Sequence, residues 1–377
     1  MISKKILFYY SQLNIGGAEK SLIRLMNALV NDGHEITLLT RFGNGNGEYL
    51  LDKRIKIFSL SKYSPLKKSN KLLYYLNLII VFLQRIIKLL ILKVQNNHYD
   101  LAIIGLQGLS PEIIYRCTSS EKCAICIRSD LQRINAKERV LESLNKWKKH
   151  VNMYLCVSKT AKDSLDILLP DLANKSIVIY NIINVDEMRK FALEAINPYP
   201  DDGRKHVVSV CRVSDKSKGV FRMLDVCRKL KEEGIFFSWY LVGDGPDLPS
   251  LKEEIRRRGL EEYFITVGKN DNPFGYYRYA DLVAVPSYYE GLCGVVNEAK
   301  VTGCAVIATE FSGIHEQLTH GQNGWIVKND TESIIDGMRL LLTDTELLQK
   351  LKNDDYPSDI KDDKTKLQLL YKACDWK

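Results

Sequence analysis

The 377-residue sequence lacks a charge-free apolar run long enough to cross a bilayer as a helix. Its most hydrophobic stretch, Leu72 to Val94, is uncharged only as far as Gln84, whereas a spanning helix needs about 20 apolar residues. A secretory signal is not predicted either, because the apolar run behind the amino terminus, Ile6 to Tyr10, has only the length of a strand. We therefore expect a cytoplasmic protein.

No disulfide framework or metal-binding pattern is present. The nine cysteines are scattered, and several lie inside apolar stretches, where a free thiol behaves as a small hydrophobic side chain. Cys123 and Cys126 have CxxC spacing, but no second pair completes a tetrahedral zinc site. The sequence thus predicts neither a bound metal nor a redox centre.

Two nucleotide-binding signatures are also missing. Gly16 and Gly17 follow the first apolar run, yet neither the Gly-Lys-Ser/Thr ending of a P-loop nor a full Gly-x-Gly-x-x-Gly fingerprint occurs. Paired glycines before a helix can still offer backbone amides to an anion at the positive helix end. A plain strand-to-helix turn is the alternative interpretation.

Acidic residues are scarce in the first half of the chain. Residues 1–195 contain 29 Lys and Arg against 17 Asp and Glu, a net charge of +12, which leaves −4 of the total of +8 for the remainder. This excess indicates an anionic partner, either a membrane surface or a phosphate-bearing acceptor, although a solvated basic face remains the alternative. We expect no nucleic-acid partner.

Apolar runs of strand length alternate with helical patterns along the whole chain, which is typical of parallel sheets covered by helices. The predicted strands are Lys5–Tyr10, Glu35–Thr40, Ile55–Ser59, Leu101–Gly105, Lys122–Ile127, Tyr154–Val157, Ile177–Tyr180, His206–Cys211, Phe236–Val242, Phe264–Val267, Leu282–Val285 and Ala305–Ala308. The turn-rich stretch Asn197 to Gly203 resembles a linker. The sequence therefore predicts two doubly wound α/β domains, residues 1–195 and 204–356.

In such sheets ligands bind beyond the carboxyl ends of the strands. Arg212 and Lys218 follow the first strand of the second domain, where a guanidinium fork and an ammonium could clamp a diphosphate. Glu290 lies in a glycine-flanked loop after another strand, and Glu298 begins the next helix. Such carboxylates can accept hydrogen bonds from sugar hydroxyls. Ordinary surface charges and a helix-capping acid are the alternatives.

The order and spacing of these motifs resemble glycosyltransferase family four, a large group of retaining enzymes with the GT-B fold. The resemblance covers nearly the whole chain and rests on Gly16-Gly17-Ala18-Glu19, Asn181 with Asn184-Val-Asp186, Arg212 with Lys218-Gly219, Val242-Gly-Asp-Gly-Pro246, Pro286-Ser287, the Glu290 and Glu298 pair, Gly313 with Glu316, and Asn323-Gly324. It implies two facing Rossmann-like domains with a cleft between them. The terminal helix, within about residues 357–377, is then expected to return to the first domain.

By this resemblance Arg212 and Lys218 neutralise the diphosphate of a nucleotide-sugar donor, Glu290 contacts the transferred sugar, and Glu298 binds the ribose. We take Glu290, Arg212 and Lys218 as the catalytic residues. The other donor contacts expected are Gly16, Gly17, Gly291, Leu292, Cys293, Gly294, Gly243, Lys269 and Glu298. No metal and no cofactor are expected, because cations and a helix terminus stabilise the departing diphosphate.

The sequence departs from the family pattern in three places. Where members often carry a histidine after a first-domain strand, Arg128 and Asp130 stand here and become candidates for acceptor contacts. The loop from Arg212 to Lys218 is one residue longer than usual, so Lys216 could replace Lys218. Cys293 occupies a position where glycine is frequent, which is tolerable if only its backbone amide is used.

The helix predicted within Leu72 to Val94 has only a narrow polar stripe, which includes Asn77, Gln84 and Lys88. Such a helix is either buried in the protein or laid on a lipid interface. Lysines precede it at positions 62, 67, 68 and 71 and favour contact with anionic lipid.

The sequence as a whole predicts a metal-independent, retaining glycosyltransferase of the hexosyltransferase type. We expect it to move a sugar from a nucleotide-diphosphate sugar to a saccharide or lipid-linked saccharide, in surface polysaccharide or glycolipid assembly. The alternatives are an inactive GT-B accessory subunit and a nucleotide-sugar epimerase or hydrolase.

Overall fold

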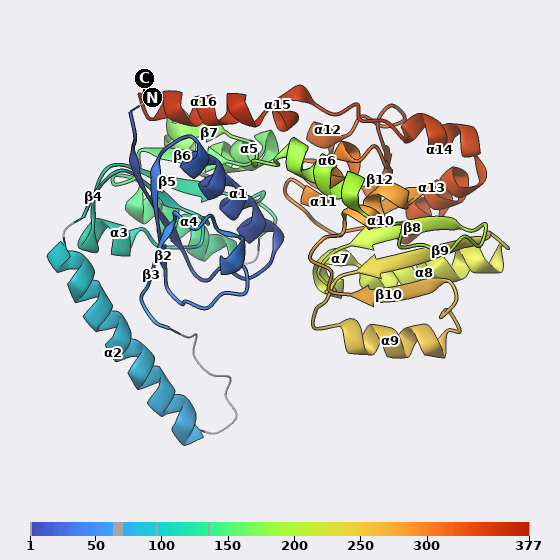
Figure 1. The fold of residues 1–377 in the computed structure, drawn as a ribbon, viewed down its shortest axis with the longest axis horizontal. Coiled ribbons are helices and arrows are strands. Elements are labelled where there is room, and N and C mark those ends of the chain that lie inside the picture. The colour runs from blue at the N-terminus through green and yellow to red at the C-terminus, as the bar shows by residue number, and fades with distance from the viewer. Residues whose placement is uncertain (1, 63–70, 96, 135, 377) are drawn as a thin grey trace. The chain divides into compact units, whose positions relative to one another are not determined.

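The structure is a computed structural model that describes residues 2–62, 71–95, 97–134 and 136–376. Two compact units make up the chain (Figure 1): the first comprises Met1–Ile182 and Asp362–Lys377, and the second comprises Ile183–Lys361.

The first unit is built on a seven-stranded sheet of parallel strands in the order β3-β2-β1-β4-β5-β6-β7. Its strands are β1 (Lys5–Tyr10), β2 (Glu35–Thr40), β3 (Lys56–Ser59), β4 (His98–Ile104), β5 (Ser119–Ile127), β6 (Met153–Cys156) and β7 (Ser176–Val178). Residues Ile6 to Tyr10 of β1 are all buried, as is usual for a central strand covered on both faces.

Helices cover this sheet and supply the rest of its hydrophobic core. They are α1 (Gly17–Asn31), α3 (Glu112–Cys117), α4 (Lys137–Trp147), α5 (Lys159–Leu168) and α16 (Asp363–Ala373), whereas α2 (Lys71–Gln95) extends away from the sheet and joins the core through Leu92. The C-terminal α16 packs into this core through Leu367, Leu370 and Tyr371, and the Tyr371 hydroxyl donates a hydrogen bond of 2.6 Å to Asp32. The last helix of the chain thus belongs to the first unit.

The second unit repeats the plan with a six-stranded parallel sheet in the order β10-β9-β8-β11-β12-β13. Its strands are β8 (Lys205–Val210), β9 (Phe237–Val242), β10 (Phe264–Gly268), β11 (Leu282–Val285), β12 (Ala305–Thr309) and β13 (Trp325–Val327). Its helices are α6 (Val185–Glu194), α7 (Asp215–Lys218), α8 (Val220–Glu232), α9 (Leu248–Arg257), α10 (Phe274–Tyr279), α11 (Gly294–Val301), α12 (Ile314–Gln317), α13 (Thr331–Thr343), α14 (Thr345–Leu351) and α15 (Ser358–Lys361).

In both sheets the strand order reverses beside the first strand, between β1 and β4 and between β8 and β11. At such a reversal the connections on either side leave in opposite directions, which opens a crevice at the carboxyl ends of the two strands. The loops after β8 and β11 therefore meet at this crevice of the second sheet, where ligands bind in open α/β folds.

The structure differs from the sequence prediction at the domain boundary. Helix α6 falls within the predicted first domain, but it packs against α10 and α11 and belongs to the second unit. The three-residue strand β13 is not among the predicted strands, because its apolar run is too short to be told from a loop.

Gly243 fixes how closely the ends of β8 and β9 approach, and it yields a test of the fold. It has a φ of +150°, and a β-carbon there would lie 1.8 Å from the carbonyl oxygen of Cys211. We expect Gly243→Ala to lower the free energy of unfolding in urea by about 2–4 kcal/mol.

The matched control is Gly259→Ala in the same unit, at a φ of +61° with open space around the added carbon. It should cost only the conformational penalty of about 1–2 kcal/mol. Equal losses for the two variants would contradict the packing role of Gly243.

Candidate donor-binding site

The centre of the candidate site is an ion pair between the loops that follow β8 and β11. The Lys218 ammonium pairs with Oε1 of Glu290, and the two side chains are only 22% and 16% exposed. Ser287 Oγ donates a hydrogen bond of 2.9 Å to the same carboxylate oxygen. Arg212 lies at the start of the loop after β8 that also carries Lys218. It is exposed and makes no ion pair with another described residue.

Glu290 stabilises the charged form of Lys218. Burial alone would lower the pKa of Lys218, but the adjacent Glu290 charge and the hydrogen bond between them outweigh it and raise that pKa above its usual value. Lys218 is therefore a permanent cation at neutral pH. It is also the lysine that the structure brings to Glu290, whereas Lys216 on the same loop is exposed.

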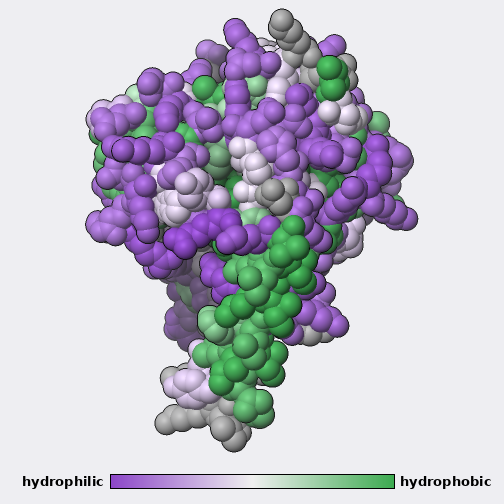
Figure 2. All heavy atoms as spheres, turned by 90° about the vertical axis from the view of Figure 1, so that its left-hand side faces the viewer, coloured by the Kyte–Doolittle hydropathy of each residue, from purple (hydrophilic) through white to green (hydrophobic). Residues whose placement is uncertain are grey.

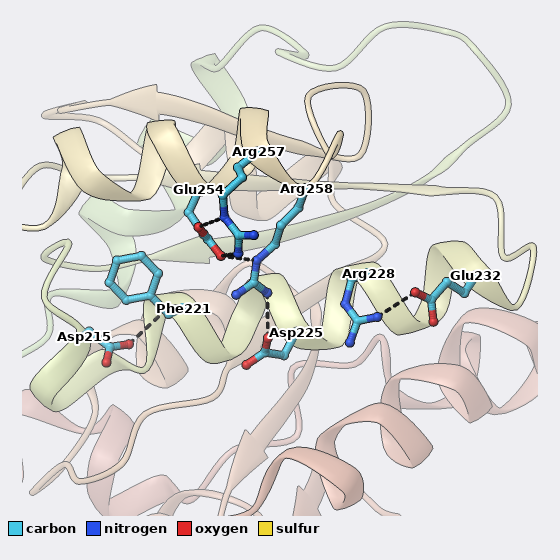
Figure 3. Close-up of polar contacts among 8 residues, drawn as sticks. All are labelled: Asp215, Phe221, Asp225, Arg228, Glu232, Glu254, Arg257 and Arg258. Atoms are coloured by element: carbon cyan, nitrogen blue, oxygen red, sulfur yellow. Dashed lines mark hydrogen bonds and ion pairs between the residues drawn. The ribbon is translucent and has the colours of Figure 1, made fainter.

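A tight turn places Lys218. Lys218 ends α7, and Gly219, with a φ of +63°, lies between α7 and α8 as the C-cap of the first and the N-cap of the second. The Asp215 carboxylate accepts a hydrogen bond of 3.0 Å from the Phe221 amide and so caps α8, as Figure 3 shows. The Asp215 amide in turn donates to Asp247, over 2.7 Å.

Surface ion pairs fasten α8 to its neighbour. The Arg258 guanidinium bridges Asp225 on α8 and Glu254 on α9, at 2.6 and 2.5 Å (Figure 3). The helix that starts behind Lys218 is thus attached to α9 as well as to the sheet.

The glycine-rich loop after β9 packs against the loop that carries Arg212. Val213 exchanges backbone hydrogen bonds with Asp244 and Asp247, and a β-carbon on Gly245 would lie 2.3 Å from the Val213 carbonyl oxygen. Together with the close approach of Gly243 to Cys211, this geometry accounts for the Gly-Asp-Gly sequence through backbone packing.

Arg222 is a residue that the sequence analysis missed. Its side chain is 4% exposed, donates to the Pro286 carbonyl and to Asn329 (2.9 Å), and stacks on Tyr288 with 4.0 Å between the guanidinium carbon and the ring centroid. Asn329 also donates to the Tyr288 carbonyl, over 2.7 Å. Arg222 thereby holds the strand end that leads to Glu290. Its position three residues after Gly219, among apolar residues, is the signal available in the sequence.

Glu298 lies on α11, where Tyr277 positions it. The buried Tyr277 hydroxyl donates a hydrogen bond of 2.9 Å to Oε2 of Glu298. Burial, reinforced by the Glu298 charge, raises the pKa of Tyr277 well above its usual value, so the phenol stays a donor. The other carboxylate oxygen can accept hydrogen bonds from a ligand.

The amides at the start of α11 divide into two kinds. Those of Gly291, Leu292 and Gly294 make no hydrogen bond to another described residue, as expected of donors that face an anion. The Cys293 amide donates to Gln317 over 2.9 Å, and the thiol is buried. Because Gln317 accepts the Cys293 amide hydrogen, a contact between that amide and a donor would require Gln317 to move, and it stays a prediction.

Lys269 follows β10 and pairs with Asp271 over 2.9 Å, half exposed. In the first unit, Gly16 and Gly17 form the amino-terminal end of α1, and Gly17 is exposed with open space where a β-carbon would lie. Sterics therefore do not require glycine at position 17 within this unit.

Arg128 and Asp130, the candidate acceptor contacts, are engaged inside the first unit. Arg128 donates to the Gly105 carbonyl (2.7 Å) and to Ser21 (3.1 Å), and it lines a small cavity with Asn181. Asp130 accepts from the Gln132 amide over 2.9 Å. These contacts fix both side chains at the carboxyl edge of the first sheet.

No group of three or more His, Cys, Asp or Glu side chains that could hold a metal occurs within the part of the chain that the structure describes. The CxxC cysteines Cys123 and Cys126 are buried on β5, and burial raises the pKa of both thiols.

The two-unit arrangement of parallel sheets is the GT-B fold, as its structural neighbours show. The crystal structure of Anabaena Alr3699/HepE in complex with UDP and glucose matches with a TM-score of 0.71 and 20% identity over 99% of both chains. The prediction of this fold from the sequence is confirmed.

Residues 194–356, which are less than half of the chain, match the family model described as glycosyl transferases group 1. A Campylobacter jejuni protein named N-acetylgalactosamine-N,N'-diacetylbacillosaminyl-diphospho-undecaprenol 4-alpha-N-acetylgalactosaminyltransferase is 28% identical over 51% of this chain, and the match spans 52% of its own length. An uncharacterized glycosyltransferase of Haemophilus influenzae is 24% identical over 94% of this chain and 96% of its own.

The buried position of Arg222 yields a test. Arg222→Lys keeps the charge but loses the two-pronged contact with Pro286 and Asn329, so we expect the free energy of unfolding to fall by about 1–3 kcal/mol. Urea unfolding measures the change.

Arg228→Lys on the same helix is the control, because Arg228 makes only an exposed pair with Glu232 among the described residues (Figure 3) and should contribute less than about 0.5 kcal/mol. If both substitutions had the same small effect, Arg222 would not hold the loop.

Proposed function

We propose that the protein is a retaining, metal-independent glycosyltransferase of the hexosyltransferase type. It takes a nucleotide-diphosphate sugar as donor and a saccharide or lipid-linked saccharide as acceptor, in the assembly of a surface polysaccharide or glycolipid in the cytoplasm. The match of residues 194–356 to the family model supports the reaction class, and the names printed for the Campylobacter protein and the Anabaena complex support the kinds of acceptor and donor. The observation that carries the proposal is the Lys218–Glu290 pair beside Arg212 at the crevice of the second sheet.

The donor diphosphate binds between Arg212, Lys218 and the free amides before α11. A diphosphate carries more negative charge than Glu290, so it competes for the Lys218 ammonium and frees the Glu290 carboxylate to accept sugar hydroxyls. Glu298, oriented by Tyr277, accepts the ribose hydroxyls.

Negative charge grows on the diphosphate as the bond to the sugar breaks. Fixed cations stabilise that charge without reorganisation, which lowers the barrier to departure. In the first unit, we propose that Gly16 and Gly17 face the donor and that Arg128 and Asp130 border the acceptor.

Loss of Lys218 tests this function. With a panel of nucleotide-diphosphate sugars as substrates and the released nucleoside diphosphate as readout, Lys218→Ala should lower kcat by at least about 100-fold. The control Lys216→Ala removes an exposed lysine from the same loop and should leave kcat within about twofold.

Activity is expected to persist in excess EDTA, because the cations in the proposal are side chains. Loss of activity with EDTA, restored by a divalent ion, would contradict it. Binding of nucleoside diphosphate without turnover of any donor by the wild type would favour the accessory-subunit alternative.

A further inference from the structure

Helix α2 is attached to the first unit by the side that carries its polar residues. Ser61 donates a hydrogen bond of 3.0 Å to Gln84, and the Lys88 ammonium lies 5.1 Å from the centre of the Phe58 ring. Val81 and Leu92 are the buried residues of this side. The polar stripe of the helix therefore faces its own domain.

The opposite side of α2 is apolar and exposed. Ile79, Phe82, Leu83, Ile87 and Leu90 are each between 52% and 60% exposed, and at 100° per residue they lie on one face. Figure 2 shows this face as a continuous hydrophobic ridge beside a largely hydrophilic surface. The alternative of a buried helix is thus wrong for this structure, and an apolar face of this extent marks an interaction site.

The charge of the surrounding segment indicates what covers this face. Between Asp52 and Asp100 the chain contains ten Lys and Arg and no Asp or Glu. Lys67 and Lys68 lie outside the described residues, but Lys62, Arg85, Lys88 and Lys93 flank or belong to α2. A segment that combines an exposed apolar face with an excess of cationic side chains complements anionic headgroups above acyl chains.

A groove along α2 also combines apolar side chains with a cationic one. It has a volume of about 440 Å³ and is lined by Phe42, Tyr75, Ile79 and Phe82, with Arg85 among its apolar walls. Arg85 and the neighbouring Arg41 each have a buried Nε without a hydrogen-bond partner among the described residues. Burial, and then the charge of Arg41, lower the pKa of Arg85. An anionic group would relieve this repulsion.

We propose that α2 docks the protein on an anionic lipid bilayer, with the helix in the plane of the interface and its outward face among the acyl chains. Leu73–Gln95 is long and apolar enough to cross a membrane by length and composition alone. However, Val81, Gln84, Lys88 and Leu92 contact the domain over three turns, and lipid cannot surround a helix so attached. This inference does not depend on the proposed transferase activity.

Flotation of the full chain with vesicles tests the docking. We expect recovery with vesicles that contain phosphatidylglycerol and little with phosphatidylcholine alone, and we expect salt at about 1 M to weaken the recovery by screening. The triple variant Leu83→Gln, Ile87→Gln, Leu90→Gln should reduce partitioning by about 100-fold or more. These side chains are exposed, so the variant should fold, which thermal unfolding checks.

The control carries the same number of changes at exposed aliphatic residues outside α2: Ile167→Gln, Leu193→Gln and Leu369→Gln. It should partition like the wild type. Unchanged flotation of the α2 variant, or equal recovery with neutral vesicles, would overturn the proposal. So would a wild type that ignores vesicles and forms dimers abolished by the α2 changes, since a second copy would then cover the face.

Discussion

The candidate site depends on one partly buried ion pair, between Lys218 and Glu290. Removing either partner would leave the other charge partly desolvated and unpaired, so the pair holds the two loops together. In the proposed reaction, the donor diphosphate replaces Glu290 as the partner of the Lys218 ammonium. The Glu290 carboxylate is then free to accept hydrogen bonds from the sugar. One interaction thus links the ordering of two loops to the recognition of the donor.

Backbone constraints make that pair possible. Gly219 turns the chain between two helices, Gly243 lets two strand ends approach, and Arg222 ties the strand before Glu290 to α8. These residues position the Lys218–Glu290 pair without having to contact a ligand themselves. The motif Gly-Asp-Gly after β9, which the sequence analysis took as part of the family resemblance, packs against the loop that carries Arg212.

Most of the fold could be predicted because its strands are continuous apolar runs, which signal a parallel sheet. The ion pair could not, because Lys218 and Glu290 lie 72 residues apart and only the strand order brings them together. The position of α6 depends on its packing against α10 and α11. The hydrogen bond of the Cys293 amide depends on Gln317, which lies 24 residues further along the chain. For α2, the sequence showed a polar stripe but not that this stripe faces the domain.

The central claim is that fixed cations of the second unit hold the donor diphosphate. The most direct measurement is a crystal structure of the full chain with a nucleoside diphosphate, grown in EDTA. The account predicts phosphate oxygens within hydrogen-bond distance of Arg212 and Lys218, with Glu290 released from Lys218. A diphosphate bound elsewhere, or one that leaves the Lys218–Glu290 pair intact, would contradict it.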